Sequence, residues 1–139
     1  MLERLILKRI QFHTTASSNF NPFQSAYLRY FSTESALLLA LDNIYHAIDT
    51  GSSTVLVSLD LSAAFDTLEH SVLRNRLQNS FGITGLALAW FQSYLSDRRQ
   101  FARIDGSKSL ETPCCTGVPQ GSVLGPMLFS IYLTYCSHC

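Results

Sequence analysis

The chain of 139 residues lacks long hydrophobic runs and lacks an excess of either charge. A membrane-spanning helix needs about 20 consecutive apolar residues, and the best candidate, Leu124–Leu133, is much shorter and contains Pro126. We therefore expect no membrane segment. Ten basic residues balance ten acidic ones, which counts against a free-standing nucleic-acid binder because phosphate contacts require a basic excess. A fragment whose basic surfaces lie elsewhere is still compatible with this balance.

The sequence also lacks a signal-peptide pattern and the paired cysteine motifs of a zinc site. The N-terminal stretch MLERLILKRIQF has charges spread through it, unlike the uninterrupted apolar region of a signal peptide. We therefore expect an intracellular protein, nuclear or cytoplasmic, whose four cysteines are free thiols. Cys136 and Cys139 form one C-x-x-C and Cys114 is adjacent to Cys115, whereas a zinc site favours two spaced pairs. The sequence predicts no zinc site.

What the chain does contain is enough apolar material for a folded core. Hydrophobic residues make up 47% of it and aromatic residues 12%, so it is not a disordered tail. Its length suits one domain or a large part of a bigger one. Periodicity and turn signals predict an α+β order of elements: helices over 1–12, 33–50, 71–79, 86–95 and 124–133, a covered strand over 54–59, and a hairpin over 98–115.

Local signals sharpen three of these predictions. Ser32 or Thr33 can cap the second helix, and Gly51 can end it. The Asp105-Gly106 pair is expected near the hairpin turn. Trp90, Phe91, Tyr94 and Leu95 recur at helical spacing, so we expect them to pack in the core.

The first chemically suggestive stretch is VSLDLSAAFD, in which an apolar run ends at Asp60. A buried strand does not need a carboxylate, since an unpaired buried charge is strongly unfavourable. At the end of a strand, however, the Asp60 carboxylate and the neighbouring Leu61 carbonyl are oxygen ligands of the kind that Mg²⁺ accepts. Phe65 follows where the chain turns away and could bar a ribose 2′-OH by steric exclusion. Asp66 could cap the following turn or pair with a base. The alternative for the stretch is that Asp60 simply caps a turn.

The second stretch is GVPQGSVLGP at residues 117–126, a Gly/Pro-rich segment that places the polar side chain of Gln120. The glycines flanking Pro119-Gln120 would let the backbone approach a ligand closely. The Gln120 amide could then bind a base, a sugar or a template backbone. A loop that merely shapes the start of a helix is the alternative.

Together these stretches resemble the reverse-transcriptase domain of non-LTR (LINE-type) retrotransposons. The resemblance rests on LVSLDLSAAFDTLEH, GITGLALAWFQSYLSDRRQ and GVPQGSVLGPMLFSIYL, with NPFQSAYLRYFSTESALL as a preceding finger-region motif. It covers nearly the whole chain. It implies a partial right-hand polymerase fold, with fingers and part of the palm in residues 1–133, an incomplete antiparallel palm sheet backed by helices, and an atypical tail at 134–139.

The resemblance also implies roles for individual residues. Asp60 matches the first catalytic aspartate and metal ligand, and the Leu61 carbonyl assists the metal. Phe65 matches the steric gate over the incoming sugar, while Gln120 and Gly121 match the motif that contacts nucleotide and template. The basic cluster of the hairpin could meet template phosphates, although a solvated face is the alternative. These candidate template or primer contacts are Arg98, Arg99 and Arg103, with Arg29 as a substitute for the arginine that the family has where Leu28 stands here.

The reaction implied is template-directed addition of dNTPs to a primer 3′-OH, with two Mg²⁺ ions clamping the attacking and leaving oxygens. RNA template, DNA primer and dNTP would be the partners, with no small-molecule cofactor. The family also carries an aromatic-Ala-Asp-Asp turn, and this chain contains no Asp-Asp pair. We therefore expect a fragment that is inactive alone. The alternatives are a non-catalytic degenerate remnant and a nucleic-acid-binding or partner-binding protein; a P-loop phosphotransferase is set aside because its glycine-rich motif is missing.

Overall fold

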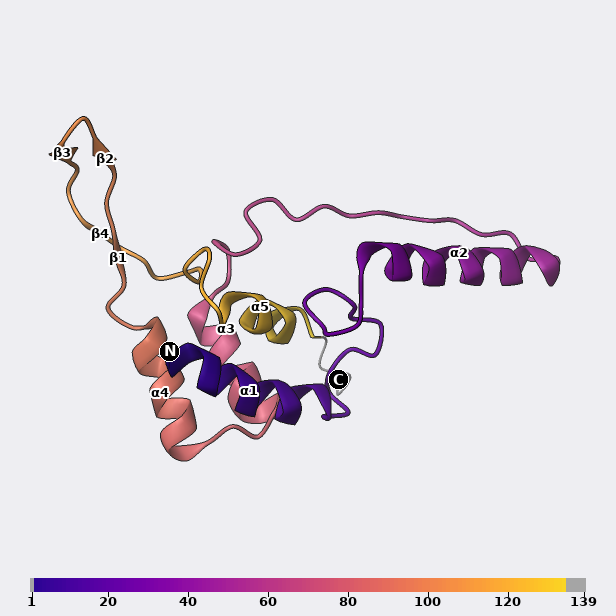
Figure 1. The fold of residues 1–139 in the computed structure, drawn as a ribbon, viewed down its shortest axis with the longest axis horizontal. Helices are drawn as coiled ribbons and strands as arrows, with labels where there is room; N and C mark the ends of the chain where they lie inside the picture. The colour runs from indigo at the N-terminus through magenta and orange to yellow at the C-terminus, as the bar shows by residue number, and fades with distance from the viewer. Residues whose placement is uncertain (1, 135–139) are drawn as a thin grey trace. The chain divides into compact units, whose positions relative to one another are not determined.

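The computed structural model describes residues 2–134, and the chain divides into two compact units. One unit comprises Met1–Asn21 and Ala63–Cys139, and the other is Pro22–Ser62. The elements in chain order (Figure 1) are α1 Leu2–Thr15, α2 Thr33–Asp49, α3 His70–Asn75, the π-helical turn η1 Arg76–Ser80, α4 Gly85–Leu95, β1 Arg99–Gln100, β2 Arg103–Ile104, β3 Ser107–Lys108, β4 Thr112–Pro113 and α5 Gly125–Leu133.

The first unit builds its core where α3 packs against η1, α4 and α5, and where α5 also packs against α1. Leu68, Leu73, Leu77 and Ile131 are fully buried there. The predicted core role of α4 is confirmed for Phe91 and Leu95, which are buried, while Trp90 and Tyr94 are half-buried.

Helix α5 confirms the core helix predicted at the end of the chain. Met127, Leu128 and Ile131 are buried along it. Its last carbonyls, those of Ile131 and Tyr132 together with that of Thr134, accept hydrogen bonds from the guanidinium of Arg76 in η1. The predicted helix over 71–79 is thus present, but its second half is wound as a π-turn that carries Arg76.

The hairpin is confirmed. Strand β1 pairs with β4 and β2 with β3, both antiparallel. Asp105 and Gly106 form the turn with φ values of +46° and +82°, the left-handed conformation that two-residue hairpin turns require. All four strands are exposed, and in Figure 1 the hairpin extends away from the helices of its unit.

In the second unit, α2 begins and ends as the sequence predicts. Ser32 is the N-cap, its hydroxyl accepting from the Ser35 backbone N–H in a reciprocal capping box. At the other end Gly51 has a φ of +77°. Its N–H donates to the Ile48 carbonyl and the Ser52 N–H donates to the Ala47 carbonyl, which is the Schellman arrangement.

The predicted covered strand over 54–59 is wrong. This segment is exposed throughout, has no regular secondary structure and makes no backbone hydrogen bond in the described part of the chain. Its β-branched, apolar residues favour a strand, but a strand requires a neighbouring strand to receive its N–H and C=O groups. The ladders of residues 2–134 belong to the hairpin, apart from one isolated bridge.

The mixture of helices with small antiparallel ladders confirms the α+β class. The polymerase-like palm and the boundary at residue 133 stay predictions, and most of the predicted tail lies outside the described residues. Within residues 2–134 no helix is both long and apolar enough to cross a membrane.

Candidate functional site

The two motifs singled out in the sequence meet inside the first unit. The Val118 N–H donates to the Phe65 carbonyl at 2.9 Å, and the Gly117 N–H donates to the Leu68 carbonyl at 2.7 Å. An isolated antiparallel bridge joins Glu69 to Thr116. The turn that carries Phe65 is therefore bound along its length to the loop that leads to Gln120.

Gly117 makes this close approach possible. A Cβ there would lie 3.0 Å from the Cα and the carbonyl oxygen of Asp66 and 3.1 Å from the Phe65 carbonyl oxygen, and the residue has a φ of +83°. The expectation that both flanking glycines let the backbone approach a ligand is wrong for Gly117, because its neighbour is the protein's own backbone. Gly121 has no atom within 4 Å of a Cβ position, so the space beside it is open.

Asp66 and Gln120 meet across this junction, although 54 positions separate them in the sequence. The Gln120 Nε2 donates to both carboxylate oxygens of Asp66, at 3.3 and 3.2 Å. This contact is exposed. The predicted turn-capping or base-pairing role of Asp66 does not describe it: the observed partner of the carboxylate is the Gln120 amide.

A pocket of about 400 Å³ opens beside the junction, a size that suits a small molecule. Phe65 is half-buried at this pocket, and its ring lies 5.1 Å from that of Phe129. A rigid aromatic wall thus faces a Gly/Pro loop bearing one amide. The lining residues are Ala63, Ala64, Phe65, Pro119, Gln120, Gly121, Ser122, Gly125 and Pro126.

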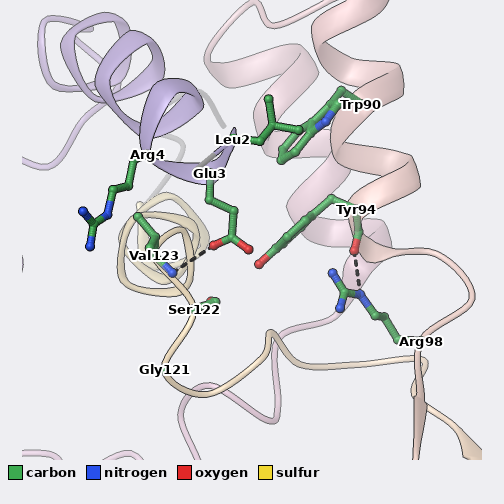
Figure 2. Close-up of a pocket in the computed structure, with 9 residues that line it drawn as sticks. All are labelled: Leu2, Glu3, Arg4, Trp90, Tyr94, Arg98, Gly121, Ser122 and Val123. Carbon is green, nitrogen blue, oxygen red and sulfur yellow. Dashed lines mark hydrogen bonds between the residues drawn. The ribbon is translucent and has the colours of Figure 1, made fainter.

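The same loop is anchored at its far end by α1. Figure 2 shows the Glu3 carboxylate accepting a hydrogen bond from the Val123 N–H, at 2.9 Å. The surrounding pocket, of about 760 Å³, includes Trp90 and Tyr94, whose rings stack at 5.3 Å. The Tyr94 hydroxyl is buried and has no hydrogen-bond partner in the described part of the chain.

The three hairpin arginines differ in how freely they could meet a ligand. Arg98 is held over the Tyr94 ring at 4.8 Å, and its Nε donates to the Tyr94 carbonyl. Arg99 lies 3.9 Å from a Glu111 carboxylate oxygen. Arg103 is exposed on β2. Arg98 and Arg99 also line a groove of about 440 Å³ that reaches Asp66 and Gln120.

Asp60, Leu61 and Arg29 belong to the other unit. Asp60 and Leu61 are exposed in the extended segment without secondary structure, and the Arg29 guanidinium lies 4.6 Å from the Tyr30 ring. Among residues 2–134 no group of three or more His, Cys, Asp or Glu residues could hold a metal ion. One carboxylate and one carbonyl do not fit a two-metal centre, which needs bridging carboxylates from more than one segment.

Sequence reasoning missed several groups that support the site. His70 Nε2 lies 2.7 Å from the Gly117 carbonyl oxygen, so this nitrogen carries the proton and donates. Glu3 holds the loop from α1, a contact across 120 positions. A lone histidine and an N-terminal glutamate give no spacing signal. The Gly-x-Pro-Gln pattern did indicate that Gly117 lies in a close approach. The group that approaches it is the backbone of Asp66, whereas the pattern suggested a ligand.

Comparison with known proteins gives a consistent match. The model of the family described as reverse transcriptase (RNA-dependent DNA polymerase) matches residues 1–138. The chain is 32% identical over 130 residues to the probable RNA-directed DNA polymerase from transposon BS of Drosophila melanogaster, covering 94% of this chain and 14% of that protein.

Two further relatives agree. The chain is 30% identical over 132 residues to the RNA-directed DNA polymerase from mobile element jockey of Drosophila melanogaster. The match covers 95% of this chain and 14% of that polymerase. The retrovirus-related Pol polyprotein from type-1 retrotransposable element R2 of Popillia japonica is 31% identical over 134 residues, covering 96% and 18%. The chain thus spans less than a fifth of each of these relatives. No solved structure matches it.

Proposed function

Because the chain belongs to the reverse-transcriptase (RNA-dependent DNA polymerase) family, we propose that it is the fingers and part of the palm of a longer non-LTR retrotransposon polymerase. That enzyme would add dNTPs to a primer 3′-OH on an RNA template. The single observation that carries the proposal is that Phe65 and Gln120, from two separate motifs, line the same pocket.

In this proposal the pocket receives the sugar and base of the incoming nucleotide. The Phe65 ring, backed by Phe129, is a rigid surface that would exclude a 2′-OH by steric contact. Gln120 supplies the amide side chain of the loop for hydrogen bonding. Arg98 and Arg99 line the adjoining groove, where their charges would attract the phosphates of a template or primer.

Asp60 is the carboxylate that this chain would contribute to magnesium binding, with the Leu61 carbonyl beside it. Since these two groups do not make a two-metal centre, we expect the other carboxylates to come from another part of the longer enzyme. Removing one member of a catalytic group that acts as a unit commonly costs several orders of magnitude in rate. The isolated chain should therefore give no primer extension above background and should bind RNA only weakly, with strong salt dependence.

A chimera tests the proposal. Residues 1–133 would replace the matching segment of the jockey polymerase, and RNA-templated DNA synthesis would be measured. We expect extension by the chimera and, on Asp60→Asn, a loss of about a thousandfold or more. Asp42→Asn, which removes an exposed carboxylate from α2 of the same unit, should leave extension unchanged. Equal activity of the Asp60→Asn and parent chimeras would refute the assignment of Asp60.

The sugar gate is tested separately. In the same chimera, Phe65→Ala removes the ring beside the pocket and should admit ribonucleotides, because the steric barrier to a 2′-OH is gone. The measurement is the ratio of dNTP to NTP incorporation, with Phe101→Ala on the exposed hairpin as the control. An unchanged ratio in Phe65→Ala would contradict the gate.

A further inference from the structure

The Asp66 carboxylate contacts the Gln120 side chain of the candidate nucleotide-binding loop. We propose that Asp66 is a positioning residue: it holds the Gln120 amide nitrogen, so that the amide oxygen is the group offered to the ligand. This inference rests on the proposed function of the pocket and deepens it. It assigns Gln120 as an acceptor, which recognises a hydroxyl or amino donor of a nucleotide.

The orientation of the amide follows from elementary hydrogen-bond chemistry. A glutamine amide has a donating nitrogen and an accepting oxygen, and the two can exchange places by rotation about one bond. An ionised carboxylate accepts hydrogen bonds and donates none. Facing Asp66, the amide must therefore present its nitrogen, as it does at 3.2 and 3.3 Å. Without the carboxylate, both orientations of Gln120 would be open.

Backbone contacts hold the segment of Asp66 against the loop that leads to Gln120, so the Asp66 carboxylate stays within reach of the amide. The Asp66 N–H donates to the Ala63 carbonyl at 2.8 Å. Gly117 lies directly against Asp66, and the His70 ring donates to the Gly117 carbonyl. These contacts hold the base of the Asp66 side chain at a constant position relative to the loop that carries Gln120.

The orientation of the Gln120 amide matters because Gln120 lies between the Phe65 pocket and the hairpin groove. Gln120 lines both the pocket beside Phe65 and the groove beside the hairpin, whereas Asp66 lines only the groove. The amide nitrogen is therefore engaged on the groove side. A ligand in the Phe65 pocket that supplies a hydrogen-bond donor then meets an amide oxygen whose orientation Asp66 has set.

The first test examines the amide without any ligand. Glutamine-selective ¹⁵N labelling of the chain, with Gln120→Met to assign the signal, would follow the exchange of the Gln120 NH₂ protons with water. Asp66→Ala should accelerate this exchange about threefold, as expected for loss of an exposed hydrogen bond to a carboxylate. Thr67→Ala, at the neighbouring exposed position, should not. An unchanged Gln120 signal in Asp66→Ala would overturn the proposal.

The second test measures the binding of a dNTP to the chain in the presence of Mg²⁺. Asp66→Asn removes a negative charge, so simple electrostatics predicts tighter binding of an anionic nucleotide, while misorientation of Gln120 predicts binding about fivefold weaker. Asp105→Asn in the hairpin turn removes the same charge from a residue that lines neither the pocket nor the groove, and it is the matched control. Weaker binding in Asp66→Asn alone supports positioning; tighter binding in both variants contradicts it.

A double-mutant comparison separates positioning from direct contact. If Asp66 acts through Gln120, Asp66→Asn should have no further effect on dNTP affinity in a Gln120→Met background. Additive losses would mean that Asp66 meets the ligand itself and would overturn the proposal. If the parent chain binds no dNTP, the proposed function of the pocket fails, and the amide-exchange measurement still decides whether Asp66 orients Gln120.

Discussion

The two units of the molecule differ sharply in how their apolar residues are used. In the unit formed by Met1–Asn21 and Ala63–Cys139, Leu73, Leu77 and Ile131 are 0% exposed. In Pro22–Ser62 no residue is buried, and Leu38 in α2 is 66% exposed. Both units are rich in leucine and isoleucine. Composition therefore predicts the need for burial in both, while only the first unit satisfies it with its own residues.

This difference bears directly on the proposed function. Phe65 and Gln120 lie in the unit that packs, and backbone hydrogen bonds hold their segments together. Asp60 lies in a segment that makes no such bonds in the described part of the chain. The chain therefore preorganises Phe65 and Gln120, which we propose face the nucleotide, and leaves Asp60, the proposed catalytic aspartate, without support. Catalysis requires groups held in a productive geometry, so the comparison explains why we expect no activity from the isolated chain.

The largest effect on stability should come from truncating a side chain in the packed core. Leu73→Ala removes a fully buried side chain and should lower the free energy of unfolding by about 2–5 kcal/mol. Leu38→Ala is the matched change on the exposed helix and should alter it by less than about 0.5 kcal/mol. Urea denaturation followed by near-ultraviolet circular dichroism measures both. Equal losses would show that Pro22–Ser62 is packed as tightly as the first unit.

The next effect concerns the junction of the two site segments. Gly117→Ala and Gly106→Ala place a methyl group at nearly the same backbone conformation, with φ values of +83° and +82°. Each should pay a left-handed strain of about 1 kcal/mol. Gly117→Ala should cost more, because its Cβ would overlap the Asp66 backbone, whereas Gly106 has open space.

Thermal unfolding and the ¹⁵N shift of the Gln120 amide together check this pair. We expect Gly117→Ala to lower the melting temperature more than Gly106→Ala and to move the Gln120 signal. If the two alanine variants behave alike, the close approach between Gly117 and Asp66 is not present in solution.

The smallest expected effect on stability is at the start of α2, where capping hydrogen bonds stabilise a helix that has no buried residue. Hydrogen bonds from the Ser32 side chain and from the Glu34 backbone hold the pKa of the Glu34 carboxyl below its ordinary value. The stability that this gives to α2 is present above the ordinary pKa of glutamate and is lost as pH falls through the lowered one.

Ser32→Ala should return the pKa of Glu34 toward its ordinary value and cost the helix about 1 kcal/mol. Carboxyl ¹³C titration of Glu34 and the α-carbon shifts of α2 measure the two effects. Ser53→Ala, beyond the end of the helix, is the control. An unmoved Glu34 titration in Ser32→Ala would contradict the capping geometry.

Much of the local structure could be read from the sequence because it depends on local chemistry. Ser32 and Gly51 bound α2, and Asp105-Gly106 forms the hairpin turn, since caps and turns need only nearby residues. The strand over 54–59 failed because β-propensity does not provide a partner. The β-branched residues Val55 and Val57 favour an extended chain, and in Figure 1 the segment runs as an extended trace without secondary structure.

The candidate site also contains residues that the sequence predicts and contacts that it does not. Phe65 and Gln120 were predicted from their motifs, and the structure brings them to one pocket. The supporting contacts of Glu3, His70 and Asp66 could not be predicted, because each depends on which distant backbone group lies within reach. A carboxylate or an imidazole at an isolated position has many possible partners, and only the fold selects one.

Hydrogen exchange of the purified chain tests the central claim most directly. The claim is that this chain fixes the Phe65–Gln120 side of the site and leaves the Asp60 segment unsupported. We predict that the amides of Leu77 and Ile131 and the Val118 amide at the junction exchange far more slowly than an unfolded peptide, while those of residues 54–61 exchange at the unprotected rate. Strong protection of residues 54–61 in the isolated chain would contradict the account, since it would show that the Asp60 segment finds its partner within this sequence.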